Sequence, residues 1–406
     1  MRRSAALFAP AAPRPPAPPP PRPPAPQPRQ ATGPRPRPPG PPGGPGYGLG
    51  VDLGTTRTAA ALWRDGLASS VPLGGRAHSV PSVLYLRDGT VLVGDAAARR
   101  GITEPEHVVR EFKRRFGDDV PLLVGEQEVG ADELTAHLLR WVLATVTEQE
   151  GRPPAHVTLT HPATWGEHRR RLLLAAAESA GLGGAGLLPE PVGAAAYYAS
   201  TQRLATDDLL AVYDLGGGTF DATVVRKTAD GFAIQGEPSG DENLGGADFD
   251  ELLMEHVAET LGISWPSLGA DDPAALAALA QVRDHVTAAK EALSTDTEAA
   301  VPVILPGHSH QVRLTRAEFE DAIREPVLRT IARLGDTVTS AGVTPGDLTA
   351  VLLTGGSSRI PLVSQLIARE LGTPVAVDAH PKYATCLGAA IAAGARLAPP
   401  AGRTAG

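Results

Sequence analysis

Two apolar runs separated by three glycines form the clearest pattern of hydrophobic and polar positions in the chain. Residues 209–212 are apolar, residues 213–221 read Tyr-Asp-Leu-Gly-Gly-Gly-Thr-Phe-Asp, and residues 222–225 are mostly apolar again. This pattern predicts a β-hairpin. Three consecutive glycines suit a sharp turn that brings bare N–H groups toward an anion. With Asp214 and Asp221 beside them, they indicate a metal–nucleotide site; the alternative is a glycine-rich hairpin with two solvated acids.

The same pattern occurs once more, earlier in the chain. Residues 48–63 again read as strand, turn and strand, and the segment from Val51 to Thr56 parallels the segment that begins at Tyr213. Asp52 lies 162 residues before Asp214, a spacing of about one domain. An internal repeat of a phosphate-type hairpin predicts two similar lobes that face one ligand.

Weaker patterns predict the other elements. Short apolar runs between turn residues indicate strands at 82–86, 91–93, 157–160, 301–305, 311–314 and 350–354. Apolar residues at helical spacing indicate helices at 131–150, 167–180, 246–261, 273–293, 316–334 and 361–371. The apolar stripe of helix 273–293 is expected to consist of Leu276, Leu279, Val282, Val286 and Leu293. Thr287, Lys290 and Ser294 share a neighbouring face of that helix.

Two predicted helices consist almost entirely of very small residues. One begins at Glu190, whose backbone is stiffened by a proline on each side, and the other covers residues 387–395. Small side chains let helices approach closely, so these two, one in each half of the chain, are predicted to cross at a hinge. The alternative is ordinary helix packing with Glu190 exposed.

A third glycine turn joins strand 350–354 to the helix that follows it. Residues 355–361 read Gly-Gly-Ser-Ser-Arg-Ile-Pro, with Ser358 as the expected N-cap and Pro361 as the first helical residue. A glycine turn before a helix N-terminus directs free amides at a ligand. The alternative is a tight strand-to-helix turn that binds nothing.

Composition and charge exclude several functions. The 406 residues carry a formal charge of −8, but residues 1–46 contain seven Arg and no acid, so the remainder carries −15. An acidic body argues against nucleic-acid binding, which needs clustered positive charge. The single cysteine, Cys386, cannot form an intrachain disulfide and suits a reducing compartment. His161 and His168, like His308 and His310, lack further ligands at metal spacing, so ordinary polar roles are expected.

The first 46 residues are expected to be a disordered tail. Residues 10–45 hold 19 of the 40 prolines, a composition that cannot build a core and favours polyproline II. Such a segment is either a ligand for a proline-recognising module or an acidic surface, or a dispensable tail. No apolar run approaches the roughly 20 residues that span a bilayer, and the first ten residues form a poor signal peptide, so a cytoplasmic location without membrane contact is expected.

Together these segments resemble the ATPase domain of the 70-kDa heat-shock (DnaK-type) chaperones over residues 48–396. The resemblance is carried, in order, by the turns at 50–56 and 214–221, by Asn-Leu-Gly-Gly-Ala-Asp-Phe-Asp at 243–250, by 355–361, and by the two small-residue helices. It implies an α/β, actin-like ATPase fold, with two ribonuclease H-like lobes around a nucleotide cleft. Lobe I would be 47–205 completed by 378–396, lobe II 206–377, and 397–406 a second disordered tail.

The resemblance also implies a site for ATP or ADP with Mg²⁺, and K⁺ as a candidate further ion. Asp52 and Asp214 would hold the magnesium through water, Glu190 and Asp221 would orient the attacking water, and Thr219 would act with them. The implied nucleotide-binding residues are Gly54, Thr55, Thr56, Gly216, Gly217, Gly218, Gly245, Gly246, Lys290, Ser294, Gly355, Gly356, Ser357 and Arg359. A protein partner or co-chaperone is expected besides the nucleotide.

The sequence departs from the family pattern at three places. Ala98, in Gly-Asp-Ala-Ala-Ala-Arg-Arg, stands where the family has a catalytic lysine, so hydrolysis is expected to be slow. Glu291 and Thr287 replace an arginine and a glutamate near adenine, so nucleotide affinity or base preference is expected to differ. No peptide-binding domain follows the ATPase region, so polypeptide binding of the chaperone kind is not expected.

The leading hypothesis is therefore an ATP-hydrolysing, chaperone-like protein in which attack of water on the γ-phosphate is coupled to lobe closure. The alternative is a catalytically weak, nucleotide-sensing interaction module. A sugar kinase shares the Asp-Leu-Gly-Thr-Thr start, but the segments at 214–221 and 243–246 disfavour it. A filament-forming, actin-like role is equally disfavoured.

Overall fold

The computed structural model describes residues 46–75, 77–265, 272–306, 308–377 and 381–397. The tails predicted at 1–46 and 397–406 lie outside these residues, except for Gly46 and Leu397 at their inner ends.

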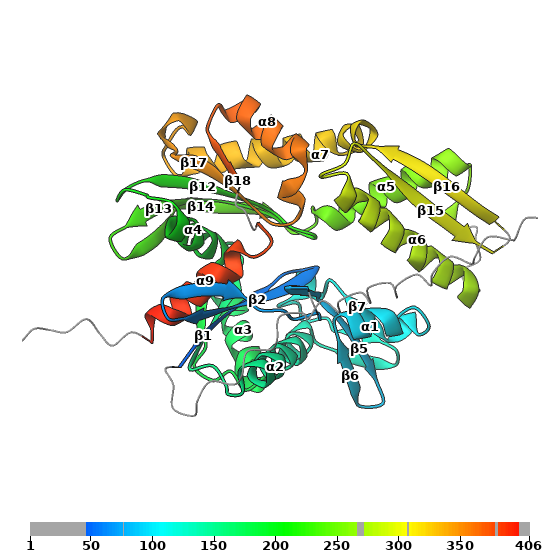
Figure 1. Cartoon of the computed structure of the whole chain (residues 1–406), viewed down its shortest axis with the longest axis horizontal. Helices are drawn as coiled ribbons and strands as arrows, with labels where there is room; N and C mark the ends of the chain where they lie inside the picture. Colours follow the sequence, from blue (N-terminus) through cyan, green and yellow to red (C-terminus); the bar gives the residue numbers. More distant parts are fainter. Residues whose placement is uncertain (1–45, 76, 266–271, 307, 378–380, 398–406) are drawn as a thin grey trace, which may run out of the picture. The chain divides into compact units, whose positions relative to one another are not determined.

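Two sheets of identical strand order organise the chain (Figure 1). The first has the order β3-β2-β1-β10-β11, formed by Leu67–Ser70, Arg57–Arg64, Gly48–Leu53, His156–His161 and Gly186–Pro189, with β4 (Ser79–Pro81) added on β2. The second has the order β14-β13-β12-β17-β18, formed by Gly231–Asp241, Phe220–Thr228, Leu209–Leu215, Ala350–Thr354 and Val375–Val377. In each, the first three strands are antiparallel and the last two are added in parallel. The internal repeat predicted from two turns therefore extends through whole sheets.

The two glycine hairpins occupy equivalent places in these sheets. Strands β1 and β2 pair with Asp52 opposite Ala59, and strands β12 and β13 pair with Asp214 opposite Asp221. Residues directly opposite in an antiparallel pair project from the same face. The second hairpin thus carries two acids on one face, where the first carries an acid and an alanine.

Each sheet is covered by helices whose apolar stripes were readable in the sequence. In the first half, α2 (Ala131–Glu150) buries Leu134, Leu138, Val142 and Val146 in the core that includes β1, and α3 (Glu167–Ser179) packs beside it. In the second half α7 (Arg316–Ser340) packs on β12, β13 and β14, and α8 (Pro361–Leu371) packs on β18. Helices α5 (Gly246–Leu261) and α6 (Pro273–Ala292) and the hairpin of β15 (Glu298–Leu305) and β16 (His308–Thr315) pack on one another beside this sheet (Figure 1). Asp272 caps α6 by accepting from the Ala274 amide at 2.9 Å.

Smaller elements lie between β4 and α2. Strands β5 (Val83–Arg87), β6 (Thr90–Val93) and β7 (Val108–Arg110) form a small sheet, and β8 (Leu122–Val124) pairs with β9 (Gln127–Val129). Asp88 and Gly89 join β5 to β6, and both have positive φ, as a tight hairpin turn of this kind requires. One short helix, α1 (Asp95–Arg100), and two single 3₁₀ turns, η1 (Pro105–His107) and η2 (Phe112–Arg115), complete this region.

Three local predictions were wrong. Helix α7 runs past Leu334 to Ser340, because burial of Thr337 and Val338 continues its apolar face through Gly335. Leu276 is 41% exposed and does not join the stripe of α6. Ser358 is not an N-cap: it lies in the 3₁₀ turn η5 (Ser357–Arg359), where its hydroxyl donates to the Thr354 carbonyl instead.

The two small-residue helices do cross. Helix α4 (Glu190–Thr201) follows the first sheet but packs Ala194 and Ala195 against Leu210 and Val212 of the second. Helix α9 (Ala384–Ala395) follows the second sheet but packs on β1 and β2 of the first. Figure 1 shows α9 lying between the first sheet and α4. Each half of the chain is therefore covered by a helix from the other half.

The crossing requires glycine. A Cβ placed on Gly388 would lie 1.8 Å from the carbonyl oxygen of Gly193 on α4. Such a contact is far inside van der Waals distance, so even alanine at residue 388 would push the helices apart.

We predict that Gly388→Ala lowers the free energy of unfolding by about 1–3 kcal/mol, the usual cost of overpacking. The matched control is Gly335→Ala in α7, where an added Cβ meets nothing within 4 Å. Because alanine favours helix over glycine, the control should gain up to about 1 kcal/mol. Urea unfolding of both variants gives the comparison, and equal effects at the two glycines would contradict the close crossing.

Candidate functional site

A cavity of about 420 Å³ lies where the glycine turns of the two sheets meet. This volume is in the range of sites that enclose small ligands. The predicted site residues that line it are Asp52, Gly54, Thr55, Thr56, Glu190, Asp214, Gly216, Gly217, Thr219, Gly246, Lys290, Ser294, Gly355, Gly356 and Ser357. Predicted residues as far apart in the sequence as Asp52 and Ser357 are thus brought together around one cavity.

Four predicted residues do not line the cavity. Gly218 and Gly245 press against each other behind the turn, since a Cβ on Gly245 would lie 2.5 Å from the Gly218 amide nitrogen. Asp221 lies on β13, and Arg359 is exposed in η5. Asp221 still acts on the site electrostatically, because its charge contributes to raising the pKa of Lys113.

The turns of the two hairpins are packed against each other. A Cβ on Gly217 would lie 2.0 Å from the Thr56 hydroxyl, and one on Gly218 would lie 2.5 Å from the Thr55 side chain. The threonines of the first turn therefore take the space that side chains on the second would need. Three glycines in a row are explained by this close approach as well as by the turn itself.

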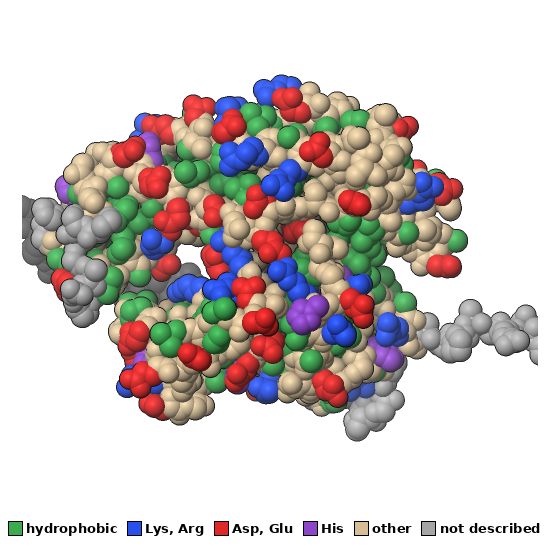
Figure 2. All heavy atoms as spheres, turned by 180° about the vertical axis from the view of Figure 1, so that it is seen from behind, with side chains coloured by type: hydrophobic (Ala, Val, Ile, Leu, Met, Phe, Trp, Pro, Cys, Tyr) green, Lys and Arg blue, Asp and Glu red, His purple; other side chains and the backbone are tan. Residues whose placement is uncertain are grey.

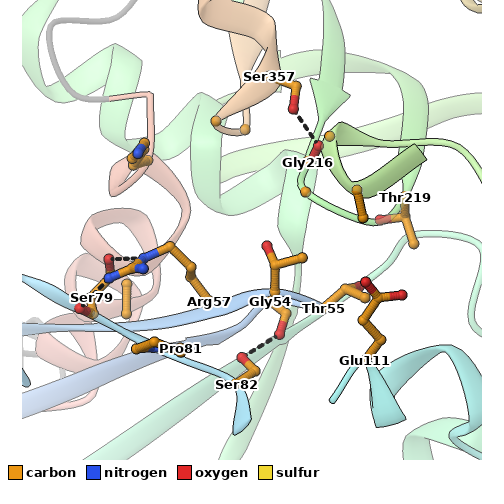
Figure 3. Close-up of a pocket in the computed structure, with 18 of the residues that line it drawn as sticks. Gly54, Thr55, Arg57, Ser79, Pro81, Ser82, Glu111, Gly216, Thr219 and Ser357 are labelled. Atoms are coloured by element: carbon orange, nitrogen blue, oxygen red, sulfur yellow. Dashed lines mark hydrogen bonds between the residues drawn. The ribbon is translucent and has the colours of Figure 1, made fainter. Parts of the chain in front are cut away.

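The two turns are held in the same way. Ser82 Oγ donates to the Gly54 carbonyl at 2.7 Å, and Ser357 Oγ donates to the Gly216 carbonyl at 2.8 Å. Figure 3 shows Gly54 and Thr55 on one side and Gly216 and Thr219 on the other, with a serine bonded to each glycine. The 3₁₀ turn η5 thus supports the second hairpin as the segment after β4 supports the first.

Partly buried carboxylates gather beside these turns. Thr160 Oγ1 donates to Asp52 Oδ1 at 2.9 Å, and Asp214 faces Asp221 across the hairpin. Burial, reinforced by the charge of Glu190, raises the pKa of Asp52 to about 6 and the pKa of Asp214 to about 7. The same causes raise the pKa of Asp221 well above its ordinary value. The group therefore carries unfavourable negative charge, which a bound cation would offset.

Lys113 is the cation that faces this group, and sequence reasoning missed it. Its Nζ lies 2.9 Å from Glu190 Oε1, and the two side chains are only 14% and 11% exposed. Burial would lower the pKa of the Lys113 ammonium, but the charges of Glu190 and Asp52 outweigh it, so the pKa is raised. Lys113 comes from η2, in a stretch without a glycine turn.

A signal for Lys113 was nevertheless present in the sequence. The chain contains 33 arginines but only four lysines, at positions 113, 227, 290 and 382. Three of these four line the cavity. The scarcity of lysine therefore draws attention to these positions, because a compact ammonium and a guanidinium are not interchangeable.

Ala98 and the two arginines after it do not contribute to the cavity. None of residues 95–100 lines it. Arg100 pairs with Glu104 at 2.9 Å, and Arg99 is exposed. Helix α1 therefore supplies no cation to the cavity.

The opposite end of the cavity is lined by α6. Lys290 pairs with Asp250 at 2.8 Å and donates to the Gly246 carbonyl at 2.5 Å, which ties α6 to the start of α5. Glu291 pairs with Lys382 at 3.4 Å. Lys382 lies in the segment before α9, so this pair ties that segment to α6.

Gly355 begins the turn that closes this side. Its φ of +81° favours glycine, and a Cβ there would lie 2.4 Å from Asp214 Oδ1. A residue with a side chain at this position would therefore displace the Asp214 carboxylate.

Contacts between the two halves flank the cavity. Arg114, next to Lys113, donates to the Gly218 carbonyl at 2.6 Å and pairs with Asp248 at 3.1 Å. Arg169 pairs with Glu242 at 2.5 Å. Figure 2 shows basic and acidic side chains close together in the hollow between the upper and lower parts of the view.

Within the described ranges, no cluster of three or more His, Cys, Asp or Glu side chains is arranged to hold a metal ion directly. His161 is buried, with Nδ1 2.8 Å from the Pro162 carbonyl oxygen, and His168 is exposed.

No helix in the described part of the chain is both long and apolar enough to cross a membrane.

We predict that Asp214→Asn stabilises the protein in the absence of metal and nucleotide. Because the pKa of Asp214 rises from 3.8 to about 7 on folding, ionisation of Asp214 increasingly destabilises the fold as the pH rises between these values. The gain from asparagine should be on the order of a few kcal/mol above pH 7 and vanish near pH 4. The size of this gain in stability depends on the neighbouring charges of Glu190, Asp52, Asp221 and Lys113.

Urea unfolding in EDTA across this pH range measures the effect. Glu128→Gln, an exposed carboxylate on β9, is the matched control and should change little at any pH. An Asp214→Asn variant less stable than the parent at pH 8 would contradict the prediction.

A family model described as Hsp70 protein matches the chain over residues 48–123 and 119–399. The match includes both glycine hairpins, the turn at 355–361 and the crossing helices α4 and α9. The repeated sheets around one cavity are the actin-like ATPase fold that the sequence predicted. The matched residues make up most of the 406, and the chain therefore belongs to the Hsp70 protein family.

Proposed function

We propose that the cavity binds ATP with Mg²⁺ and that the protein hydrolyses the γ-phosphate in a chaperone-like cycle coupled to lobe closure. Membership of the Hsp70 family supports a nucleotide-binding, chaperone-type ATPase domain. The observation that carries the finer proposal is the cavity in which two glycine turns meet a group of carboxylates.

The residues present fit this ligand. Three carboxylates line the cavity, those of Asp52, Glu190 and Asp214. The pKa values of Asp52 and Asp214 are raised. Among the basic residues of the described structure, only Lys113 contacts this group. Oxygen donors on one or two carboxylates, with water between, are the ligands that Mg²⁺ prefers. Asp52 and Asp214 would hold the ion through water. Bound Mg²⁺ would neutralise charge on the phosphates.

The phosphates would lie against the paired turns. Gly54, Thr55 and Thr56 line the cavity from one hairpin, and Gly216, Gly217 and Thr219 from the other. Backbone amides of such turns and threonine hydroxyls donate to phosphate oxygens. Because the turns are locked against each other through Gly217 and Thr56, they would keep one geometry during the reaction.

The remaining chemistry would come from the other acids. Glu190 and Asp221 would orient the attacking water, with Glu190 lining the cavity and Asp221 acting from behind Asp214. Adenosine would contact Lys290 on α6, Ser294 in the turn after α6 and Gly356 in the turn after β17. Arg114 and Arg169 would couple this chemistry to the lobes, because each bonds across the two halves. K⁺ is a candidate second ion.

The proposal predicts Mg²⁺-dependent release of phosphate from ATP by the purified chain. Asp52→Asn and Asp214→Asn should each lower the hydrolysis rate by about 100-fold, the usual loss when one charge-stabilising group is removed. Nucleotide binding measured by calorimetry in EDTA should change much less, since these acids act through the ion. Glu128→Gln on β9 is the control and should hydrolyse ATP at the parent rate.

Two outcomes would count against this function. If the parent chain does not bind ATP with Mg²⁺, the cavity is not a nucleotide site. If it binds ATP tightly but turns it over near the uncatalysed rate, the nucleotide-sensing module suggested by Ala98 is the better interpretation.

A further inference from the structure

We propose that the end of the cavity lined by α6 reads the edge of a guanine base, so that guanine nucleotides are ligands of this chain alongside ATP. The inference rests on the proposed function and names a further substrate class for the same site. It is carried by the side chains that line this end of the cavity.

The base has to be recognised here by its edge. Among the described residues that line the cavity there is no Phe, Tyr, Trp or His, so no aromatic ring is present for a base to stack on. Ile360, which is buried, and Pro381 supply apolar contact at this end. Such side chains can touch the face of any base, so the choice between bases falls to the polar groups beside them.

One face of α6 presents hydrogen-bond acceptors to the cavity. Asp284, Thr287 and Glu291 follow one another at helical spacing, and all three line it. Thr287 is bonded to Asp250, whereas the carboxylates of Asp284 and Glu291 are exposed. The two oxygens of a carboxylate accept hydrogen bonds side by side. Guanine offers two such donors, N1–H and the N2 amino group, whereas adenine offers only its N6 amino group.

The donor beside these acceptors is Lys382. Its Nζ lies 3.4 Å from Glu291 Oε1, and its Cε lies 3.6 Å from where a Cβ on Gly356 would be. The backbone keeps the segment in place, because the Gly355 amide donates to the Pro381 carbonyl at 3.3 Å. Lys382 therefore reaches across the turn after β17 toward α6. A lysine ammonium donates to O6 and N7 of guanine.

Lys382 can turn to a ligand more easily than Lys290 can. Lys290 is buried and is held by Asp250 at 2.8 Å and by the Gly246 carbonyl. The pair of Lys382 and Glu291 is longer, and its side chains are 28% and 60% exposed. Exposed pairs contribute little to stability, so exchanging this one for bonds to a base costs little.

An ammonium beside a carboxylate fits guanine better than adenine. Guanine presents O6 next to N1–H and the N2 amino group, so Lys382 and Glu291 could make three hydrogen bonds with it. Adenine places an amino group where guanine has O6, and that group would face the ammonium. Adenine is typically read by Asn or Gln, and neither type occurs among the described lining residues.

The test compares GDP with ADP by calorimetry in Mg²⁺. The parent should bind GDP at least as tightly as ADP, and should bind IDP, which lacks the N2 amino group, about 10-fold more weakly than GDP. Glu291→Gln and Lys382→Met should each lower the ratio of GDP affinity to ADP affinity by about 10-fold. Because this is a ratio, it is insensitive to changes that affect both nucleotides alike. The control, Glu128→Gln on β9, should leave the ratio unchanged.

The outcomes separate this inference from the proposed function. A parent chain that binds ADP and hydrolyses ATP but binds GDP more weakly than ADP would overturn the inference alone. An unchanged ratio in either variant, or equal affinities for GDP and IDP, would also overturn it. A parent chain that binds neither ADP nor GDP would overturn both.

Discussion

The close approach of partly buried like charges beside two packed turns is the constraint on which the rest of the structure depends. Asp52, Asp214 and Asp221 are carboxylates that burial drives toward the protonated form. Nothing in hydrophobic packing favours such a group, because desolvated charges of one sign destabilise a fold. The glycine turns, their supporting serines and Lys113 can be understood as the means by which this arrangement is held until a cation and a polyanion join it.

The rest of the chain keeps the two turns at this distance. Each turn grows from a sheet, and the sheets are joined through α4 and α9, which cross at Gly193 and Gly388. Arg114 adds a second connection directly behind the glycine turn. A small rotation about the helix crossing would therefore separate the turns. The shape of the cavity thus changes whenever the two halves change their orientation relative to each other.

Local patterns in the sequence predicted the hairpins, the repeat and most helices, because glycine turns and apolar spacing act over a few residues. The hairpin at 209–228 and helix α2 are examples. Contacts between residues far apart in the sequence could not be predicted from these local patterns. Lys113 meets Glu190 across 77 positions, and Ser358 was assigned to a cap because its bond to Thr354 depends on how η5 folds back. The scarcity of lysine was the one clue to the first of these, and it is a property of the whole chain rather than of a motif.

The exchange of helices between the halves has a consequence for the order of synthesis. The first sheet and its helices, up to α3, are complete once residue 189 has left the ribosome, yet the face of β1 and β2 covered by Cys386, Leu387 and Ala390 stays open. About 200 further residues must be made before α9 can close it, which at typical translation speeds takes on the order of 10–40 s. For that time an apolar face made of Ala59 and Ala61 is exposed, so the nascent chain of this family member itself presents the kind of surface that chaperones bind.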